Sequence, residues 1–125
     1  MIPDDLLFTE KHEWVRIDGD TATVGISDYA RQQLGDIVYV ELPETGVKVS
    51  KMNAFGTIEA VKAVSDLYAP VSGEVLEVND SIAADPTVIK NSPYGDGWMI
   101  KIKMSEPGEA DSLLKPEKYK ELIGE

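Results

Sequence analysis

The sequence predicts a mainly β protein, folded as a sandwich or flattened barrel with short helices at its sides and one at its carboxyl end. Short runs of β-forming residues recur along the chain, separated by glycine, proline, asparagine and aspartate. Helical spacing of apolar residues is confined to short pieces. A chain of 125 residues with 42% hydrophobic content can build one core, so we expect a single domain over residues 1–125.

Local signals place the elements of the first half. The extended segments predicted there are residues 14–17, 21–26, 36–42 and 47–49. The first two form a hairpin, because Gly19 between them tolerates the positive φ of a tight turn. Ser27 is a suitable N-cap, and Gly35 can end a helix in the left-handed αL region, so a short helix is expected over residues 28–34.

A hairpin around Lys62 dominates the middle of the chain, in a segment placed at about residues 55–80. Two apolar-rich runs flank Lys62, and turn residues from Pro70 onward mark the return. The apolar residues expected to anchor this hairpin in the core are Ile58, Val61, Val64, Leu67 and Val71. Small neighbours leave the amine of Lys62 unshadowed at the tip, although a solvated surface lysine is the ordinary interpretation of such a position.

The elements predicted after this hairpin are one helical turn from Asp85-Pro86, a loop over 91–97, a strand over 98–104 and a helical segment over about 109–124. The strand is expected to be half-buried, because its apolar residues alternate with Lys101 and Lys103. In the terminal segment Tyr119, Leu122 and Ile123 recur at helical spacing, so this helix is predicted to pack an apolar stripe on the sheets.

Composition excludes several classes of function. The chain has no cysteine, so it has no thiolate nucleophile, disulfide or thiolate metal site, and its single histidine, His12, excludes a multi-histidine metal site. With 12 basic and 23 acidic residues the net charge is -11, which opposes binding to a nucleic-acid backbone. Solubility alone, or steering toward basic partner proteins, explains this charge. Any reactive group is therefore expected to be attached to the chain.

No segment indicates export or insertion into a membrane. The amino end is acidic where a secretion signal needs basic residues. No stretch approaches the roughly 18 apolar residues of a membrane span. We therefore expect a soluble intracellular protein without a membrane partner. The sequon that begins at Asn79 is interpreted as a polar turn.

Two neighbouring segments carry a family resemblance. Residues 59–66 (EAVKAVSD) and 69–75 (APVSGEV) resemble the lipoyl-lysine segment of the glycine cleavage system H protein. Further blocks of the family's pattern follow in the same order, at residues 12–15, 24–26, 34–38, 40–43, 92–95 and 97–102. Biotin carriers resemble this family in fold, but their lysine typically lies between two methionines, whereas Val61 and Ala63 flank Lys62 here. The resemblance favours lipoate over biotin.

The resemblance implies a barrel-sandwich hybrid of two small antiparallel sheets, in which Lys62 carries lipoic acid as N6-lipoyllysine. It implies a carrier protein and not an enzyme. In this family a pyridoxal-phosphate glycine decarboxylase (P protein) loads an aminomethyl group onto the lipoyl arm. A tetrahydrofolate-dependent aminomethyltransferase (T protein) then removes it, and dihydrolipoamide dehydrogenase (L protein) reoxidises the arm. A lipoate-attaching enzyme, a monomeric state and a cytoplasmic location are expected as well, with a mature mitochondrial form left open.

By the same resemblance, Glu13 and Asp66 border a cleft that receives the loaded arm, where a carboxylate pairs with the arm's cationic amine. The residues alone equally allow an exposed strand carboxylate at position 13 and a turn residue at position 66. The chain departs from the common family pattern near this cleft at Lys11, where a small hydroxyl residue is usual, and at Tyr29, where histidine is frequent. Lys11 either repels a loaded amine or points to solvent.

Other functional classes compete with the lipoyl carrier. A lipoyl relay or storage protein would carry the same segment around Lys62. An enzyme that forms an imine with Lys62 needs a desolvated amine, which a hairpin tip among acids does not offer. A purely structural interaction module gives no reason for the hairpin. His12 is interpreted as structural or solvated, and Trp14 and Trp98 as core aromatics.

Overall fold

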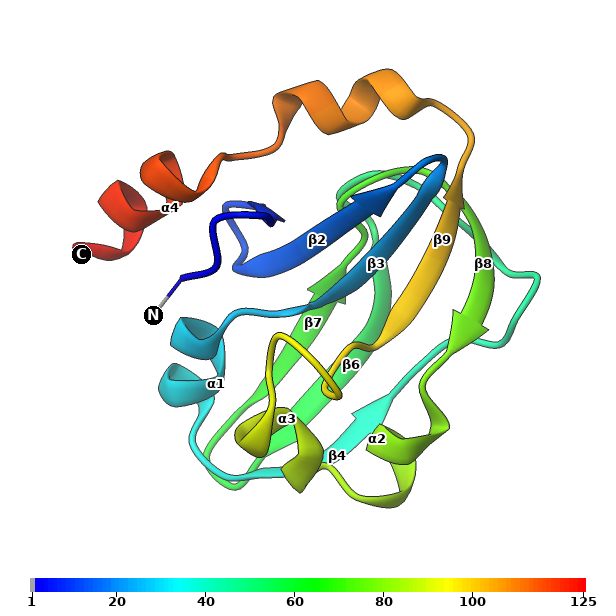
Figure 1. The fold of residues 1–125 in the computed structure, drawn as a ribbon. Helices are drawn as coiled ribbons and strands as arrows, with labels where there is room; N and C mark the ends of the chain where they lie inside the picture. Colours follow the sequence, from blue (N-terminus) through cyan, green and yellow to red (C-terminus); the bar gives the residue numbers. More distant parts are fainter. Residues whose placement is uncertain (1) are drawn as a thin grey trace.

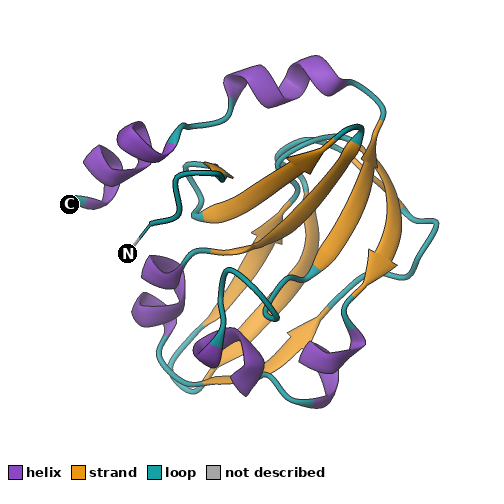
Figure 2. Ribbon diagram, in the orientation of Figure 1, coloured by secondary structure: helices purple, strands orange, loops and turns teal. Residues whose placement is uncertain are grey.

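The computed structural model describes residues 2–125 and consists of two antiparallel sheets packed on each other, with helices at their edges (Figures 1 and 2). The larger sheet has the strand order β1-β2-β3-β9-β8-β5, and the smaller has the order β4-β6-β7. The strands are β1 (Leu7–Phe8), β2 (Glu13–Asp18), β3 (Thr21–Ile26), β4 (Ile37–Glu41), β5 (Lys48–Val49), β6 (Ala54–Ala60), β7 (Val64–Tyr68), β8 (Gly73–Val78) and β9 (Ile100–Met104). The helices are α1 (Asp28–Leu34), α2 (Asp80–Ala84), α3 (Thr87–Asn91), the 3-10 helix η1 (Pro107–Ser112) and α4 (Pro116–Ile123). The predicted fold class is confirmed.

The amino-terminal hairpin and the first helix follow their local signals. β2 and β3 pair along their whole length, and Gly19 turns between them at φ 64°. β3 then leads into α1, where the Oγ of Ser27 accepts the backbone N–H of Ala30 at 3.2 Å. Asp28 in the first helical turn receives Arg31 at 2.6 Å. Both predictions are confirmed, because a turn and an N-cap act over only a few residues.

Asn79 begins a helix where the sequence indicated a polar turn. Its side-chain oxygen accepts the N–H of Ser81 as the N-cap of α2. Its amide nitrogen donates to the backbone oxygens of Asp96 at 2.8 Å and Trp98 at 2.7 Å. Asn79 is buried, so this polar residue holds α2 against the loop that precedes β9. The expectation of a simple turn was wrong, because its decisive partners lie far along the chain.

The hairpin around Lys62 is shorter than the predicted segment 55–80. β6 and β7 form the hairpin, and β7 ends at Tyr68. β8 pairs with β5 and β9 in the larger sheet. The turn residues after Pro70 therefore carry the chain from one sheet to the other. They do not belong to one continuous hairpin.

The main core lies between the two sheets. Three of the five predicted hairpin anchors are buried there, namely Ile58, Leu67 and Val71. Val61 and Val64 are 76% and 66% exposed, so the expectation that they anchor the hairpin was wrong. Val61 lies in the turn itself. Val64 pairs with the exposed Glu59, which places it on the outer face of the small sheet.

The carboxyl-terminal helix α4 forms a second, smaller core with the amino-terminal segment (Figure 1). Tyr119 is fully buried and stacks on Phe8 with ring centroids 4.3 Å apart. Ile123 packs at the edge of this cluster. Leu122 is 49% exposed, so the predicted apolar stripe is wrong at this position. The helix itself spans residues 116–123, as its periodicity predicted.

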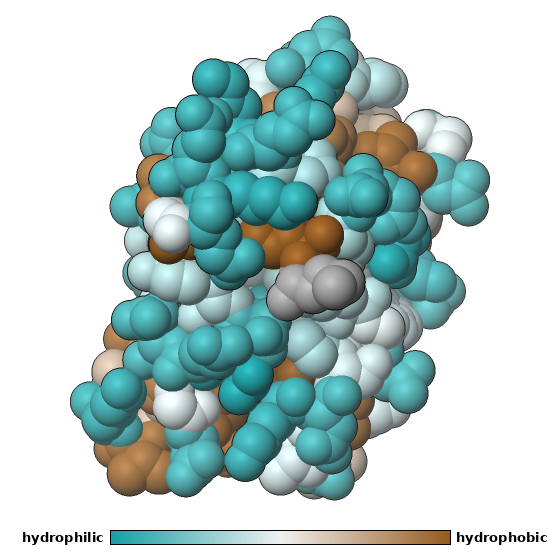
Figure 3. Space-filling view, turned by 60° about the vertical axis from the view of Figure 1, so that its left-hand side comes forward, coloured by the Kyte–Doolittle hydropathy of each residue, from teal (hydrophilic) through white to brown (hydrophobic). Residues whose placement is uncertain are grey.

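The outer surface is largely hydrophilic on the face that carries α1 and the two chain ends, with small hydrophobic areas between polar side chains (Figure 3). Within residues 2–125, no helix is both long enough and apolar enough to cross a membrane. The half-buried strand predicted at 98–104 is β9, which starts two residues later than expected. Its three apolar residues are buried, and Lys103 is exposed.

Candidate functional site

Lys62 lies in the tight turn between β6 and β7. The turn is closed by the backbone N–H of Ala60, which donates to the oxygen of Ala63 at 2.7 Å. Below it, Glu59 pairs with Val64 in the register of the hairpin. Lys62 and the residues on either side of it are exposed. No salt bridge within residues 2–125 involves the Lys62 amine. The turn therefore presents a primary amine that is accessible to an enzyme.

The connection between α1 and β4 braces this turn from one side. The backbone N–H of Val61 donates to the oxygen of Asp36 at 3.0 Å. Gly35 has φ 81° and ψ -141°, and a methyl group added there would lie 3.6 Å from Cε of Lys62. The positive φ was predicted, but the αL conformation was not adopted, because the chain extends at once into β4 beside the hairpin. Figure 1 shows this connection beside the β6–β7 turn.

A cavity of about 330 Å³ opens beside the hairpin, between α1, the loop before β2 and strands β6 and β7. We call it the hairpin cavity. Its lining residues are Lys11, His12, Glu13, Ile26, Tyr29, Ala30, Gln33, Leu34, Ile58, Ser65, Asp66 and Leu67. The structure thus brings Glu13 and Asp66, which are 53 positions apart in the sequence, to one cavity. Lys11 and Tyr29, the two departures from the family pattern, line it as well.

Glu13 is the buried acid of this cavity, with only 2% of its surface exposed. The hydroxyl of Thr9 donates to Oε1 at 2.5 Å, and the backbone N–H of Tyr68 donates to Oε2 at 3.3 Å. Burial raises the pKa of Glu13 to about 7, although these hydrogen bonds favour the ionised form. The interpretation as an exposed strand carboxylate is excluded. Thr9 and the backbone of Tyr68 were not singled out from the sequence, since no local pattern signals either contact.

The opposite rim differs in character. Asp66 is exposed on β7, so its carboxylate is solvated where that of Glu13 is not. The Nζ of Lys11 lies 5.9 Å from the ring centroid of Tyr68, a contact that turns this cation toward an aromatic face. The ring of Tyr29 lies 5.0 Å from that of His12. The cavity therefore combines one buried acid, one exposed acid, a lysine and two aromatic rings.

His12 is structural as well as exposed to the cavity. Its Nδ1 lies 2.9 Å from the hydroxyl of Tyr119, and its backbone adopts φ 73°. Burial and the neighbouring Lys11 lower its pKa. Of the two tryptophans, Trp14 is a core aromatic as predicted, with its indole N–H donating to the oxygen of Pro93 at 2.8 Å. Trp98 is only half-buried, with the Lys101 amine 5.0 Å from its ring.

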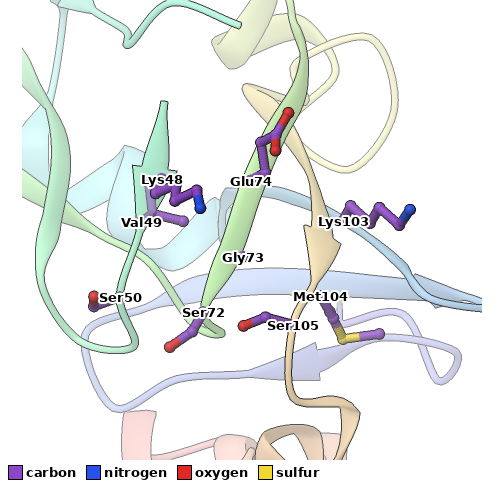
Figure 4. A pocket seen from close by; sticks show the side chains of 9 residues that line it. All are labelled: Lys48, Val49, Ser50, Ser72, Gly73, Glu74, Lys103, Met104 and Ser105. Carbon is purple, nitrogen blue, oxygen red and sulfur yellow. The ribbon is translucent and has the colours of Figure 1, made fainter. Parts of the chain in front are cut away.

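A second cavity of about 470 Å³ lies among β5, β8 and β9 (Figure 4). Lys48, Glu74 and Lys103 stand in register across these three strands. This row alternates charge and is a cross-strand pairing that stabilises the sheet. It shares no residue with the hairpin cavity. Within residues 2–125, no three acidic or histidine side chains are grouped to hold a metal ion.

Comparison with known proteins identifies the family. The family model described as glycine cleavage H-protein matches residues 6–125, which is nearly the whole chain. The chain belongs to the glycine cleavage H-protein family. The glycine cleavage system H protein of Rubrobacter xylanophilus is 58% identical over 94% of this chain and 91% of the relative. That of Staphylococcus carnosus is 48% identical over 99% of this chain and 98% of the relative.

The family also includes a plant relative and a solved structure. The mitochondrial H protein of Oryza sativa subsp. indica is 56% identical over 93% of this chain and 71% of the relative. The crystal structure of the H protein from Mycobacterium marinum covers 99% of this chain and all of its own, with 40% identity and a TM-score of 0.92. The resemblance predicted from the blocks around Lys62 is therefore confirmed over the whole length of the chain.

Proposed function

We propose that this protein is the lipoyl carrier of a glycine cleavage system, with lipoic acid attached to the amine of Lys62. Membership of the H-protein family supports this proposal. The single observation that carries it is the position of Lys62, exposed in a two-stranded turn that is braced from one side. The protein would act as a carrier component of a multi-enzyme system. It would not act as an enzyme.

The residues around Lys62 fit such an attached group. Acylation of a lysine amine removes its charge, and nothing in the turn requires that charge, because no described residue pairs with it. When bound, the lipoyl group supplies the disulfide and dithiol chemistry that a chain without cysteine lacks. The chain contributes an attachment point and a surface beside it. Tethering keeps the carried unit from diffusing away between enzymes.

The partners follow from this proposal. The carrier would receive an aminomethyl group from glycine decarboxylase (P protein) and deliver it to aminomethyltransferase (T protein). Dihydrolipoamide dehydrogenase (L protein) would then restore the disulfide. A lipoate-attaching enzyme would act on Lys62 beforehand. We further propose a monomer that works in the bacterial cytoplasm, as the bacterial relatives suggest.

We also propose that the hairpin cavity shelters the loaded arm. Glu13 and Asp66 both line this cavity beside the Lys62 turn. A carboxylate there can pair with a cationic amine, and the low exposure of Glu13 makes such a pair stronger than one in open water. Lys11 lines the same cavity, and its contact with the ring of Tyr68 turns its charge aside from the two acids.

Intact mass spectrometry of protein from its native cells tests the attachment. We expect one lipoyl mass increment on the native chain and none on Lys62→Arg, which keeps the charge but cannot form the amide. Lys90→Arg is the matched control, because Lys90 is an exposed lysine on α3. An increment that persists in Lys62→Arg, or that is absent from every native preparation, contradicts the proposal.

Reconstitution separates the carrier from a lipoyl relay. Fully lipoylated protein should support glycine decarboxylation with its P, T and L partners. Failure to do so would favour a relay or storage role. An imine-forming enzyme is disfavoured by the exposure of Lys62, since such a lysine needs a desolvated pocket. Borohydride with carbonyl substrates should therefore trap no adduct.

A further inference from the structure

One tyrosine hydroxyl connects two walls of the hairpin cavity from outside it. The first wall is the loop before β2, which carries His12, and the second is α1, whose N-cap is Ser27. Tyr119 of α4 does not line the cavity, yet its Oη lies 2.9 Å from Nδ1 of His12 and 2.6 Å from Oγ of Ser27. Its ring is fixed by the stack on Phe8. A group from the carboxyl-terminal helix thus contacts both walls.

The direction of these hydrogen bonds follows from the burial of Ser27. Ser27 is fully buried, and its Oγ accepts the backbone N–H of Ala30. Within residues 2–125, the hydroxyl of Tyr119 is the one acceptor in reach of the Ser27 hydroxyl hydrogen. Because a buried donor is costly to leave unpaired, Ser27 donates to Tyr119. The hydrogen of Tyr119 is then free to be donated to Nδ1 of His12.

An imidazole that accepts a hydrogen bond at Nδ1 carries its proton on Nε2 and is neutral. The lowered pKa of His12 agrees with this state. The backbone of His12 is held as firmly as its ring. Its φ of 73° is unusual for a residue other than glycine, and its oxygen accepts the N–H of Ser27 at 2.9 Å. His12 is therefore tied to the start of α1 by a backbone bond and through Tyr119.

We propose that the hydroxyl of Tyr119 is a positioning group that clasps the two walls of the hairpin cavity and holds His12 as the neutral tautomer with its proton on Nε2. Its role in sheltering a carried group rests on the proposed function. The clasp itself is a property of the chain alone. Tyr119→Phe removes only the hydroxyl and keeps the ring that stacks on Phe8, so the fold should persist.

Nitrogen-15 spectra of the single histidine test the clasp directly. Unmodified protein near neutral pH should show Nε2 protonated and Nδ1 as a hydrogen-bonded acceptor. Tyr119→Phe should shift the Nδ1 signal and mix the two tautomers. The matched control is Tyr94→Phe, because the hydroxyl of Tyr94 accepts the backbone N–H of Asp28 at 2.9 Å, also at the start of α1, without contacting His12.

Three results would overturn the clasp. The first is a wild-type His12 with its proton on Nδ1. The second is an unchanged spectrum in Tyr119→Phe, and the third is an equal change in Tyr94→Phe. Circular dichroism should show that both variants are folded, so that a shift reports the hydrogen bond and not unfolding.

The functional consequence is tested on lipoylated protein loaded with the aminomethyl group in the absence of T protein. We expect the loaded form of Tyr119→Phe to decay about fivefold faster than wild type, as the loss of one hydrogen bond of ordinary net strength would allow. Acylation of Lys62 should proceed at the wild-type rate, because the turn contacts neither Tyr119 nor His12. Equal decay rates would overturn the positioning role. If the protein cannot be loaded at all, the proposed function fails, whereas the histidine spectra still decide the clasp.

Discussion

At the scale of single residues, the two acids of the hairpin cavity show that position in the fold and not residue type sets their chemistry. Glu13 is buried and has a pKa raised to about 7 by that burial. Asp66 lines the same cavity but is exposed. A carboxyl that titrates near neutrality can exist in either form at working pH. The cavity therefore holds one acid whose charge depends on its surroundings and one that water stabilises.

Replacement of Glu13 by glutamine should change how stability depends on pH. The folded-state pKa of Glu13 is raised from 4.5 to about 7, so the folded state binds the proton more tightly than the unfolded chain. The contribution of Glu13 to stability is thus fully present below pH 4.5, falls as the pH rises toward 7, and stays lost above it. At about 1.4 kcal/mol per pKa unit, the fall is on the order of 3 kcal/mol.

Urea unfolding of the unacylated protein at pH 5 and pH 8 measures this effect. Glu13→Gln should gain stability relative to wild type between the two pH values, because it has no proton to lose. The control is Glu10→Gln, where the replaced side chain is exposed. A stability difference between Glu13→Gln and wild type that is the same at both pH values would contradict the prediction.

At the scale of elements, the Lys62 hairpin is held by a segment that precedes it in the chain by about one strand. The oxygen of Asp36 accepts the N–H of Val61, and Gly35 lies against the aliphatic part of Lys62. The conformation of Gly35, with φ 81° and ψ -141°, is one that residues with a Cβ avoid. The presentation of Lys62 therefore depends on a glycine outside the hairpin.

Gly35→Ala should destabilise the protein by about 1–3 kcal/mol and slow the acylation of Lys62. Gly46→Ala is the matched control, because Gly46 also has a positive φ, of 88°, but has no neighbouring atom within 4 Å of an added methyl group. Both variants should lose stability in chemical denaturation. Only Gly35→Ala should lower the initial rate of lipoylation, followed by intact mass. Equal lipoylation rates would show that the brace does not position the lysine.

At the scale of the whole molecule, charge and architecture serve different purposes. The net charge of -11 surrounds a compact two-sheet core, and Glu59 and Asp66 are exposed close to Lys62. A field of this sign speeds encounters with basic surfaces and has little effect on the fold. A carrier that visits several enzymes benefits from fast association, because tight binding would slow its release.

Ionic strength should therefore affect the encounter and not the chemistry. We expect kcat/KM for reoxidation of the reduced lipoylated protein by dihydrolipoamide dehydrogenase to fall by roughly tenfold between about 0.05 and 0.5 M salt, with kcat little changed. Stopped-flow measurements over this range test it. A second comparison pairs Glu41→Gln/Glu59→Gln, on the small sheet near Lys62, with Glu106→Gln/Glu117→Gln of the same net charge. A kcat/KM that is independent of salt would leave solubility as the explanation of the charge.

The sequence by itself determined the elements whose signals are local. The hairpin turn at Gly19, the Ser27 cap of α1, the periodicity of α4 and the turn at Lys62 each involve only a few consecutive residues, so their patterns could be interpreted without a fold. Motif blocks spread along the chain also sufficed to predict the family.

Only the tertiary structure decided which side chains are buried and which distant residues meet. The exposure of Val61 and Val64, the burial of Glu13 and the transfer of β8 to the larger sheet all depend on how the two sheets pack. The contact between His12 and Tyr119 joins residues 107 positions apart. No local pattern encodes such a contact, because its energy is gained only after the intervening chain has folded.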